Sequence, residues 1–245
     1  MERKTVNLLN FPIDTFSSED AFKYAKTLLD GSKSSHIVTI NPEIIESAKK
    51  NSHLERILKE AELVVADGIG IKIGLLIKGQ KVDRIAGIDF AKRLVEEAAK
   101  SGIPTALVGA KQEVLEKATE ELSKNNSGLN IVYTHNGYFD NNTEIINELK
   151  EKSPKLLLVA MGAPKQEEFI YEAKSVLPST LMIGIGGSFD VWAGNVKRAP
   201  KIWQKLGLEW LYRTIKQPER FKRIFPTLPK FICSIIEEQY LKKGV

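Results

Sequence analysis

Short apolar runs rich in β-branched residues alternate with longer amphipathic segments along the first 194 residues. The short runs predict strands, and segments with apolar positions three or four residues apart predict helices. We expect strands near Val6–Leu9, Ile37–Ile40, Leu63–Ala66, Thr105–Val108, Asn130–Tyr133, Leu156–Met161 and Leu181–Ile185. Helical patterns run from Ile88 to Lys100 and from Gln112 to Lys124. This alternation predicts an α/β fold, with a Rossmann-like, mostly parallel sheet and flanking helices.

The pattern changes after residue 194. Residues 195–245 carry twelve Lys and Arg against four Asp and Glu, a net charge of +8, and seven of the 19 aromatic residues. We therefore expect a 1–194 α/β domain and a 195–245 helical, basic appendage. Arg213, Lys216, Arg220 and Arg223 are spaced three, four and three residues apart, which would align them on one helical face, although Pro218 is expected to divide the segment into two helices.

Composition bounds the class of protein. A chain of 245 residues with 42% hydrophobic content can bury a sizeable core. The sequence has neither a signal-peptide core nor an apolar stretch approaching about 18 residues, so we expect a cytoplasmic protein. The single cysteine, Cys233, excludes an internal disulfide and is predicted to be a packing residue. The three histidines lack metal-ligand spacing and are predicted at the surface or at strand edges.

Polar and glycine residues gather where the predicted strands end. Open α/β sheets bind ligands at the carboxyl ends of their strands, and glycines let a ligand approach the backbone. These ends carry Thr39 and Asn41, Asp67-Gly68, Gly109, Gly162 to Glu167, and Gly186 to Asp190. A nucleotide is the ligand that this pattern favours.

Individual residues at these ends have two interpretations. Asp67 is either a proton acceptor or the N-cap of the following helix, and Asp190 has the same ambiguity. Arg84 either holds a diphosphate or pairs with a surface acid. A dinucleotide-dependent oxidoreductase would need a complete G-x-G-x-x-G after the first strand, which the chain lacks. A nucleic-acid-binding module would explain the basic segment but not the polar strand ends, so we expect no nucleic-acid partner.

Several motifs together resemble the WecG/TagA/CpsF glycosyltransferase family, most closely its teichoic-acid linkage branch. They stand in the family's order and are Thr39-x-Asn41, Ala66-Asp67-Gly68-x-Gly70, Arg84-x-x-Gly87-x-Asp89, Met161-Gly162-Ala163-Pro164-Lys165-Gln166-Glu167, Gly186-Gly187-x-Phe189-Asp190, Arg198-Ala199-Pro200 and Gly207-Leu208-Glu209-Trp210-Leu211-Tyr212-Arg213. The resemblance implies inverting transfer of N-acetylmannosamine from a UDP donor to undecaprenyl-diphosphate-linked GlcNAc. N-acetylmannosaminuronic acid or another hexose remains an alternative sugar.

The resemblance also implies roles for single residues. Asp67 matches the proposed base; Arg84, Thr39 and Gln166 match positions that handle the donor or its diphosphate. Substrate binding is implied for Asn41, Gly109, Gly162, Lys165, Gly187 and Asp190. Residues 195–245 are implied to be a membrane-proximal appendage that completes the active site of the 1–194 catalytic domain. Within it, Arg213, Arg220 and Arg223 are implied in contact with the lipid diphosphate at the membrane. No Asp-x-Asp pair is present, so we expect no metal and no cofactor. We further expect peripheral association with the inner membrane face and a possible homo-oligomer.

Overall fold

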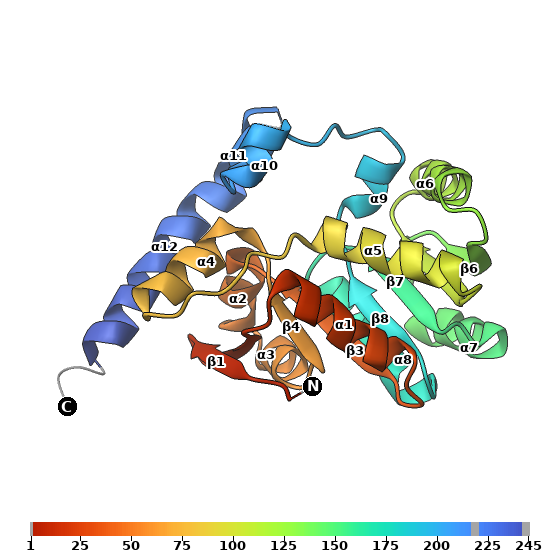
Figure 1. Cartoon of the computed structure of the whole chain (residues 1–245), viewed down its shortest axis with the longest axis horizontal. Helices are drawn as coiled ribbons and strands as arrows, with labels where there is room; N and C mark the ends of the chain where they lie inside the picture. Colours follow the sequence, from red (N-terminus) through yellow and green to blue (C-terminus); the bar gives the residue numbers. More distant parts are fainter. Residues whose placement is uncertain (1, 217–220, 242–245) are drawn as a thin grey trace.

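One parallel sheet organises the molecule. The computed structural model describes residues 2–216 and 221–241. Within them six parallel strands pair in the order β4-β3-β8-β7-β5-β6. They are β3 (Ser35–Ile40), β4 (Leu63–Ala66), β5 (Pro104–Gly109), β6 (Asn130–His135), β7 (Leu156–Ala160) and β8 (Leu181–Gly184). The predicted α/β class with a parallel sheet is confirmed, and all strand carboxyl ends share one edge (Figure 1).

Helices cover both faces of this sheet because its strands are apolar on both sides. Within β3, Ile37 faces one helical layer while Val38 and Ile40 face the other. The first layer contains α1 (Ser18–Leu29), α5 (Gly87–Lys100), α6 (Gln112–Asn125) and α9 (Ser188–Trp192). The second layer contains α2 (Pro42–Ala48), α3 (Ser52–Lys59), α4 (Gly68–Ile77), α7 (Asn142–Lys152) and α8 (Lys165–Val176).

A hairpin at the N-terminus packs on the second layer. Its strands are β1 (Thr5–Leu8) and β2 (Phe11–Asp14), and it buries Leu8, Phe11 and Ile13. Asp14, at the end of β2, is buried, pairs with Arg3 at 2.7 Å, and accepts a hydrogen bond from the Val64 amide at 2.7 Å. This buried carboxylate therefore ties the hairpin to edge strand β4.

The C-terminal segment is helical, as predicted. It contains α10 (Lys201–Lys205), α11 (Glu209–Lys216) and α12 (Phe221–Leu241). Figure 1 shows α12 as a long helix lying along α4 and α2. Phe231 and Ile235 of α12 are fully buried in the same apolar cluster as the N-terminal hairpin and α4. The segment after residue 194 therefore contributes side chains to the core of the α/β layers.

Two smaller expectations were wrong. Cys233 is exposed on α12, because the buried side of that helix is formed by Phe231 and Ile235. His36 lies on β3 inside the sheet and is only 2% exposed, since helices cover both faces of this central strand. In the described ranges, no helix is both long enough and apolar enough to span a bilayer.

Candidate active site

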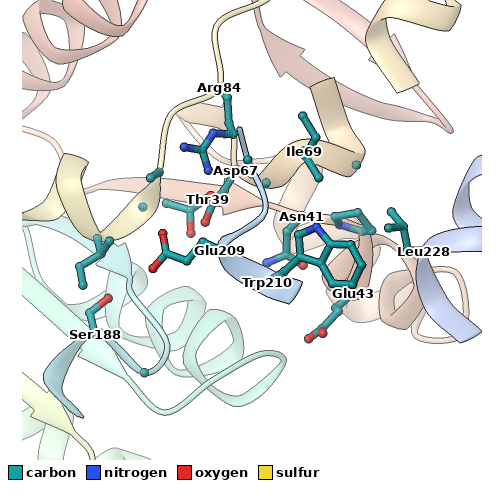
Figure 2. Close-up of a pocket in the computed structure, with 18 of the residues that line it drawn as sticks. Thr39, Asn41, Glu43, Asp67, Ile69, Arg84, Ser188, Glu209, Trp210 and Leu228 are labelled. Carbon is teal, nitrogen blue, oxygen red and sulfur yellow. The ribbon is translucent and has the colours of Figure 1, made fainter. Parts of the chain in front are cut away.

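A cavity of about 260 Å³ opens at the carboxyl ends of β3, β4 and β8. Its walls come from these strand ends, the loop before α5, and the segment that includes α11 and α12. Figure 2 shows Thr39, Asp67, Arg84 and Glu209 directed into one part of the cavity, with Trp210 beside Asn41 and Glu43. Segments far apart in the sequence thus converge on one polar pocket.

Asp67 follows β4 directly and stands at the N-cap position of α4 without making a side-chain capping bond. Its carboxyl lines the cavity instead. Burial in the cavity wall raises the pKa of Asp67 to about 6; the amide of Gly87, the charge of Arg84 and the amide of Gly68 oppose this rise, and Glu209 adds to it. A carboxylate of this pKa is a stronger proton acceptor than an ordinary aspartate and is still ionised at neutral pH.

Thr39 and Asn41 lie at the end of β3 and are both fixed by hydrogen bonds. The Thr39 hydroxyl donates to the Gly184 carbonyl of β8 at 3.3 Å. Asn41 is the N-cap of α2, where its side-chain oxygen accepts from the Ile44 amide at 3.1 Å and Pro42 occupies the first turn. Both side chains line the cavity, so the bonds that fix them also position them at its wall.

Arg84 lines the cavity and also holds the C-terminal segment. Its guanidinium donates to the Gln204 carbonyl in α10 at 2.7 Å. Because an arginine carries five N–H donors, this bond leaves other donors to face an anionic ligand. The local sequence left a diphosphate contact and a surface ion pair open for Arg84, and its position at the cavity favours the first.

The C-terminal segment supplies one wall of the cavity. It provides Gly207, Glu209, Trp210, Thr227 and Leu228. The sequence showed Glu209 and Trp210 within a motif but gave them no role. The signal that could have found them is a carboxylate beside a tryptophan in an otherwise basic segment. Glu43 and Ser188 also line the cavity and were not predicted.

Gln166 lies behind the cavity and braces two glycine loops. It is 5% exposed, and its side-chain oxygen accepts from the amides of Gly162 at 3.1 Å and Gly186 at 2.9 Å. Its nitrogen donates to Glu167 at 2.8 Å. Burial raises the pKa of Glu167 to about 7. Gln166 is thus placed to shape the loops that follow β7 and β8.

The other predicted binding residues divide between the cavity and the rest of the sheet edge. Gly187 lines the cavity. Gly109 ends β5 at φ +133°, where a β-carbon would overlap the Ala160 carbonyl at 2.4 Å. Lys165 is exposed at the start of α8, and Asp190 is half-buried in α9. Gly109, Gly162, Lys165 and Asp190 line the sheet edge outside the residues that form this cavity.

The predicted lipid-binding arginines fall on or next to the undescribed residues. Arg220 lies outside the described ranges, and the side chains of Arg213 and Arg223 are likewise not described. Arg213 belongs to α11 and Arg223 to α12. Pro218, which was expected to divide the segment into two helices, also lies outside the described residues. Among the described residues, no group of three or more His, Cys, Asp or Glu side chains could hold a metal ion.

A parallel α/β sheet with a carboxylate, an arginine and glycine loops around a cavity at its carboxyl edge defines a Rossmann-like protein with a group-transfer type of site. The sequence profile of the glycosyl transferase WecG/TagA/CpsF family matches residues 6–244, and the chain belongs to this family. It is similar to the N-acetylglucosaminyldiphosphoundecaprenol N-acetyl-β-D-mannosaminyltransferase of Bacillus spizizenii, with 32% identity over 240 residues that cover 98% of this chain and 93% of the relative.

Proposed function

We propose that this protein transfers N-acetylmannosamine from UDP-N-acetylmannosamine to undecaprenyl-diphosphate-linked GlcNAc, a step of wall teichoic acid synthesis. The observation that carries the proposal is the cavity in which Asp67, Arg84, Thr39 and Asn41 converge. The activity for which the Bacillus spizizenii relative is named supports the choice of sugar and acceptor.

In this proposal Asp67 is the base of an inverting displacement. Its carboxylate takes the proton of the acceptor hydroxyl while that oxygen attacks the anomeric carbon of the donor sugar. The bond from this carbon to the diphosphate breaks, and UDP leaves with the electron pair on the opposite side. Arg84 and the amides of the glycine loops would stabilise the diphosphate charge.

Membrane association belongs to the same proposal. The acceptor is a lipid, and the +8 charge of residues 195–245 would attract an anionic bilayer surface. Among the described residues of this segment, the large apolar side chains that are exposed are Ile202, Leu206, Ile215, Phe225 and Ile236. Exposed apolar side chains on a basic helical segment are typical of peripheral membrane binding.

Incubation with a panel of UDP-sugars and a lipid-diphosphate-GlcNAc acceptor tests the proposal. We expect mass spectrometry to show a product one N-acetylhexosamine heavier, with UDP-N-acetylmannosamine as the preferred donor. Transfer of a different sugar would redirect the specificity, and absence of transfer from every donor would contradict the proposal. The same reaction in EDTA should proceed at an unchanged rate, because the sequence lacks the Asp-x-Asp pair of metal-bridged donor sites.

A further inference from the structure

Arg198 links the C-terminal segment to the sheet layers through two carboxylates. Its guanidinium pairs with both oxygens of Asp89 on α5, one of them at 3.1 Å, and donates to Glu209 on α11 at 3.2 Å. The side chains of Arg198 and Glu209 are 24% and 12% exposed. The planar guanidinium of Arg198 binds both carboxylates in this partly buried place. It therefore fixes the orientation of each carboxylate more closely than a single surface ion pair would.

Glu209 reaches the cavity from the opposite wall to β4. Figure 2 shows its carboxylate directed towards the part of the cavity that Asp67 and Thr39 line. Besides Asp67 and Glu209, the charged side chains that line the cavity in the described ranges are Arg84 and Glu43. The chain thus places a second negative charge opposite Asp67, where solvent screening is reduced.

Contacts around Arg198 hold this arrangement to the rest of the segment. Gln204 donates to the carbonyl of Ala199, which follows Arg198, at 2.6 Å, and its own carbonyl accepts from Arg84. The rings of Trp203 and Tyr212 pack with their centroids 5.8 Å apart and join α10 to α11. These contacts therefore fix the place of Glu209 relative to Arg84 and Arg198.

We propose that Glu209 is a positioning residue for the transfer reaction: the C-terminal segment brings its carboxylate to the cavity that Asp67 lines, Arg198 holds it there, and its charge strengthens Asp67 as the base. The proposal rests on the proposed function and extends it, because it assigns to the segment an electrostatic action on the base. Like charge across the cavity favours the protonated form of Asp67, which is the form that results when it takes the acceptor proton. The same effect accounts for the direction in which Glu209 moves the pKa of Asp67.

Direct titration of Asp67 tests this without relying on turnover. The full-length protein is labelled with ¹³C-aspartate, the Asp67 carboxyl resonance is assigned with Asp67→Asn, and its midpoint is followed by NMR. We expect Glu209→Gln and Glu209→Ala, two neutral replacements, to lower the midpoint by up to about half a unit, because burial rather than Glu209 is the main cause of the raised pKa. Glu209→Asp should keep most of the wild-type midpoint. Glu120→Gln, which removes a charge from the exposed side of α6, should leave it unchanged.

Kinetics then connects the titration to the reaction. In Glu209→Gln, the apparent pKa on the acid side of the kcat/KM profile should fall by the same amount as the NMR midpoint. The rate on the plateau of the profile should also be lower. The inference would be overturned if Glu209→Gln, Glu120→Gln and the wild-type protein shared the same NMR midpoint and the same apparent pKa of kcat/KM. A wild-type protein that transfers no sugar would instead contradict the proposed function, and the NMR midpoint would still decide the role of Glu209.

Discussion

At the scale of single residues, Asp67 is the position at which activity and stability should separate. It occupies an N-cap position without the capping bond, and its pKa of about 6 lies above the ordinary value of 3.8. Ionisation of Asp67 therefore costs stability as the pH rises through about 6, and the cost is absent below 3.8. The same group must be ionised to accept a proton, so the wild-type kcat/KM should rise through pH 6.

Asp67→Asn keeps the shape and removes the base. We expect turnover to fall by about 10² to 10⁴, UDP affinity to change little, and the melting temperature at pH 7.5 to stay level or rise. Single-turnover rates, calorimetry with UDP and thermal unfolding measure the three quantities. Near-wild-type turnover would show that Asp67 is not the base. A large loss of melting temperature would restore the capping interpretation.

Strand-end residues such as Asp67 and Asn41 could be predicted from the sequence because a parallel sheet gathers them at one edge. Asp67 makes no capping bond at the start of α4, whereas Asn41 does cap α2. Glu209 stands out as a carboxylate in a basic segment, but its place at the cavity depends on how the C-terminal segment folds back over the sheet, which its spacing does not reveal. Gln166 was predicted to touch the donor, and that role stays a prediction. Its bonds to the Gly162 and Gly186 amides are tertiary contacts that spacing does not reveal.

His36 predicts how stability depends on pH. Burial, helped by the charge of Lys174, lowers its pKa to about 3 from 6.5. The unfolded chain therefore binds a proton between these values that the folded protein does not, and stability should fall as the pH drops below 6.5. For this group the loss is about 2 kcal/mol between pH 8 and pH 5.

Urea unfolding of His36→Gln measures this contribution. The difference in unfolding free energy between pH 8 and pH 5 should shrink by about 2 kcal/mol relative to the wild-type protein. His53→Gln, at an exposed histidine of α3, is the matched control and should keep the wild-type difference. An equal pH dependence in all three proteins would show that His36 is protonated in the folded state.

At the scale of elements, α12 packs closely on α4 because α4 carries glycines on the side that faces α12. A β-carbon at Gly70 would stand 2.5 Å from Cγ of Pro42 and 2.8 Å from Cδ1 of Leu228. One at Gly74 would stand 2.5 Å from Cδ1 of Ile235. The close approach of α2, α4 and α12 therefore requires the missing side chains, and it places Leu228 at the cavity.

Gly70→Ala should have two opposite effects on stability, a gain from helix propensity and a loss from overpacking. Alanine gains about 1 kcal/mol in a helix interior, but the Pro42 ring cannot turn away, and overpacking costs about 1–3 kcal/mol. We expect a net loss of stability and weaker UDP binding, measured by urea unfolding and calorimetry. Lys72→Ala, on the more open side of the same helix, is the control for propensity. A Gly70→Ala protein more stable than the wild-type protein would contradict the close packing of α2, α4 and α12 at this glycine.

The predictability of elements follows from their composition. The β-branched runs that became β3, β4, β5, β7 and β8 were expected within one or two residues, because buried parallel strands read as continuous apolar runs. Strand β2 was missed, since it is short and contains Pro12, which lowers strand propensity. Its partner is the neighbouring strand β1, and its burial depends on contacts with β4 and α12.

At the scale of the whole molecule, one apolar core contains residues from both sides of the boundary expected at residue 194. Phe231 and Ile235 pack with Leu8, Ile71 and Leu75, so removal of residues 195–245 would uncover an apolar surface. Loss of activity in such a truncated protein could then come either from destabilisation of the fold or from loss of the cavity wall, and the experiment would not separate the two. Membrane binding is therefore better tested by surface charge in a chain of full length.

Lys201 and Lys205 are exposed on α10, within the segment of net charge +8. Each basic residue near an anionic surface contributes about 1 kcal/mol, so Lys201→Gln and Lys205→Gln should each weaken binding to phosphatidylserine-containing vesicles about fivefold. Lys117→Gln removes the same charge from α6 in the other helical layer and should change binding little. Co-sedimentation at two salt concentrations measures the effect, which should diminish at high salt because the attraction is screened. Equal vesicle binding by all three variants would show that the charge of this segment does not recruit the protein, and the lipid acceptor would then have to be reached through the apolar side chains alone.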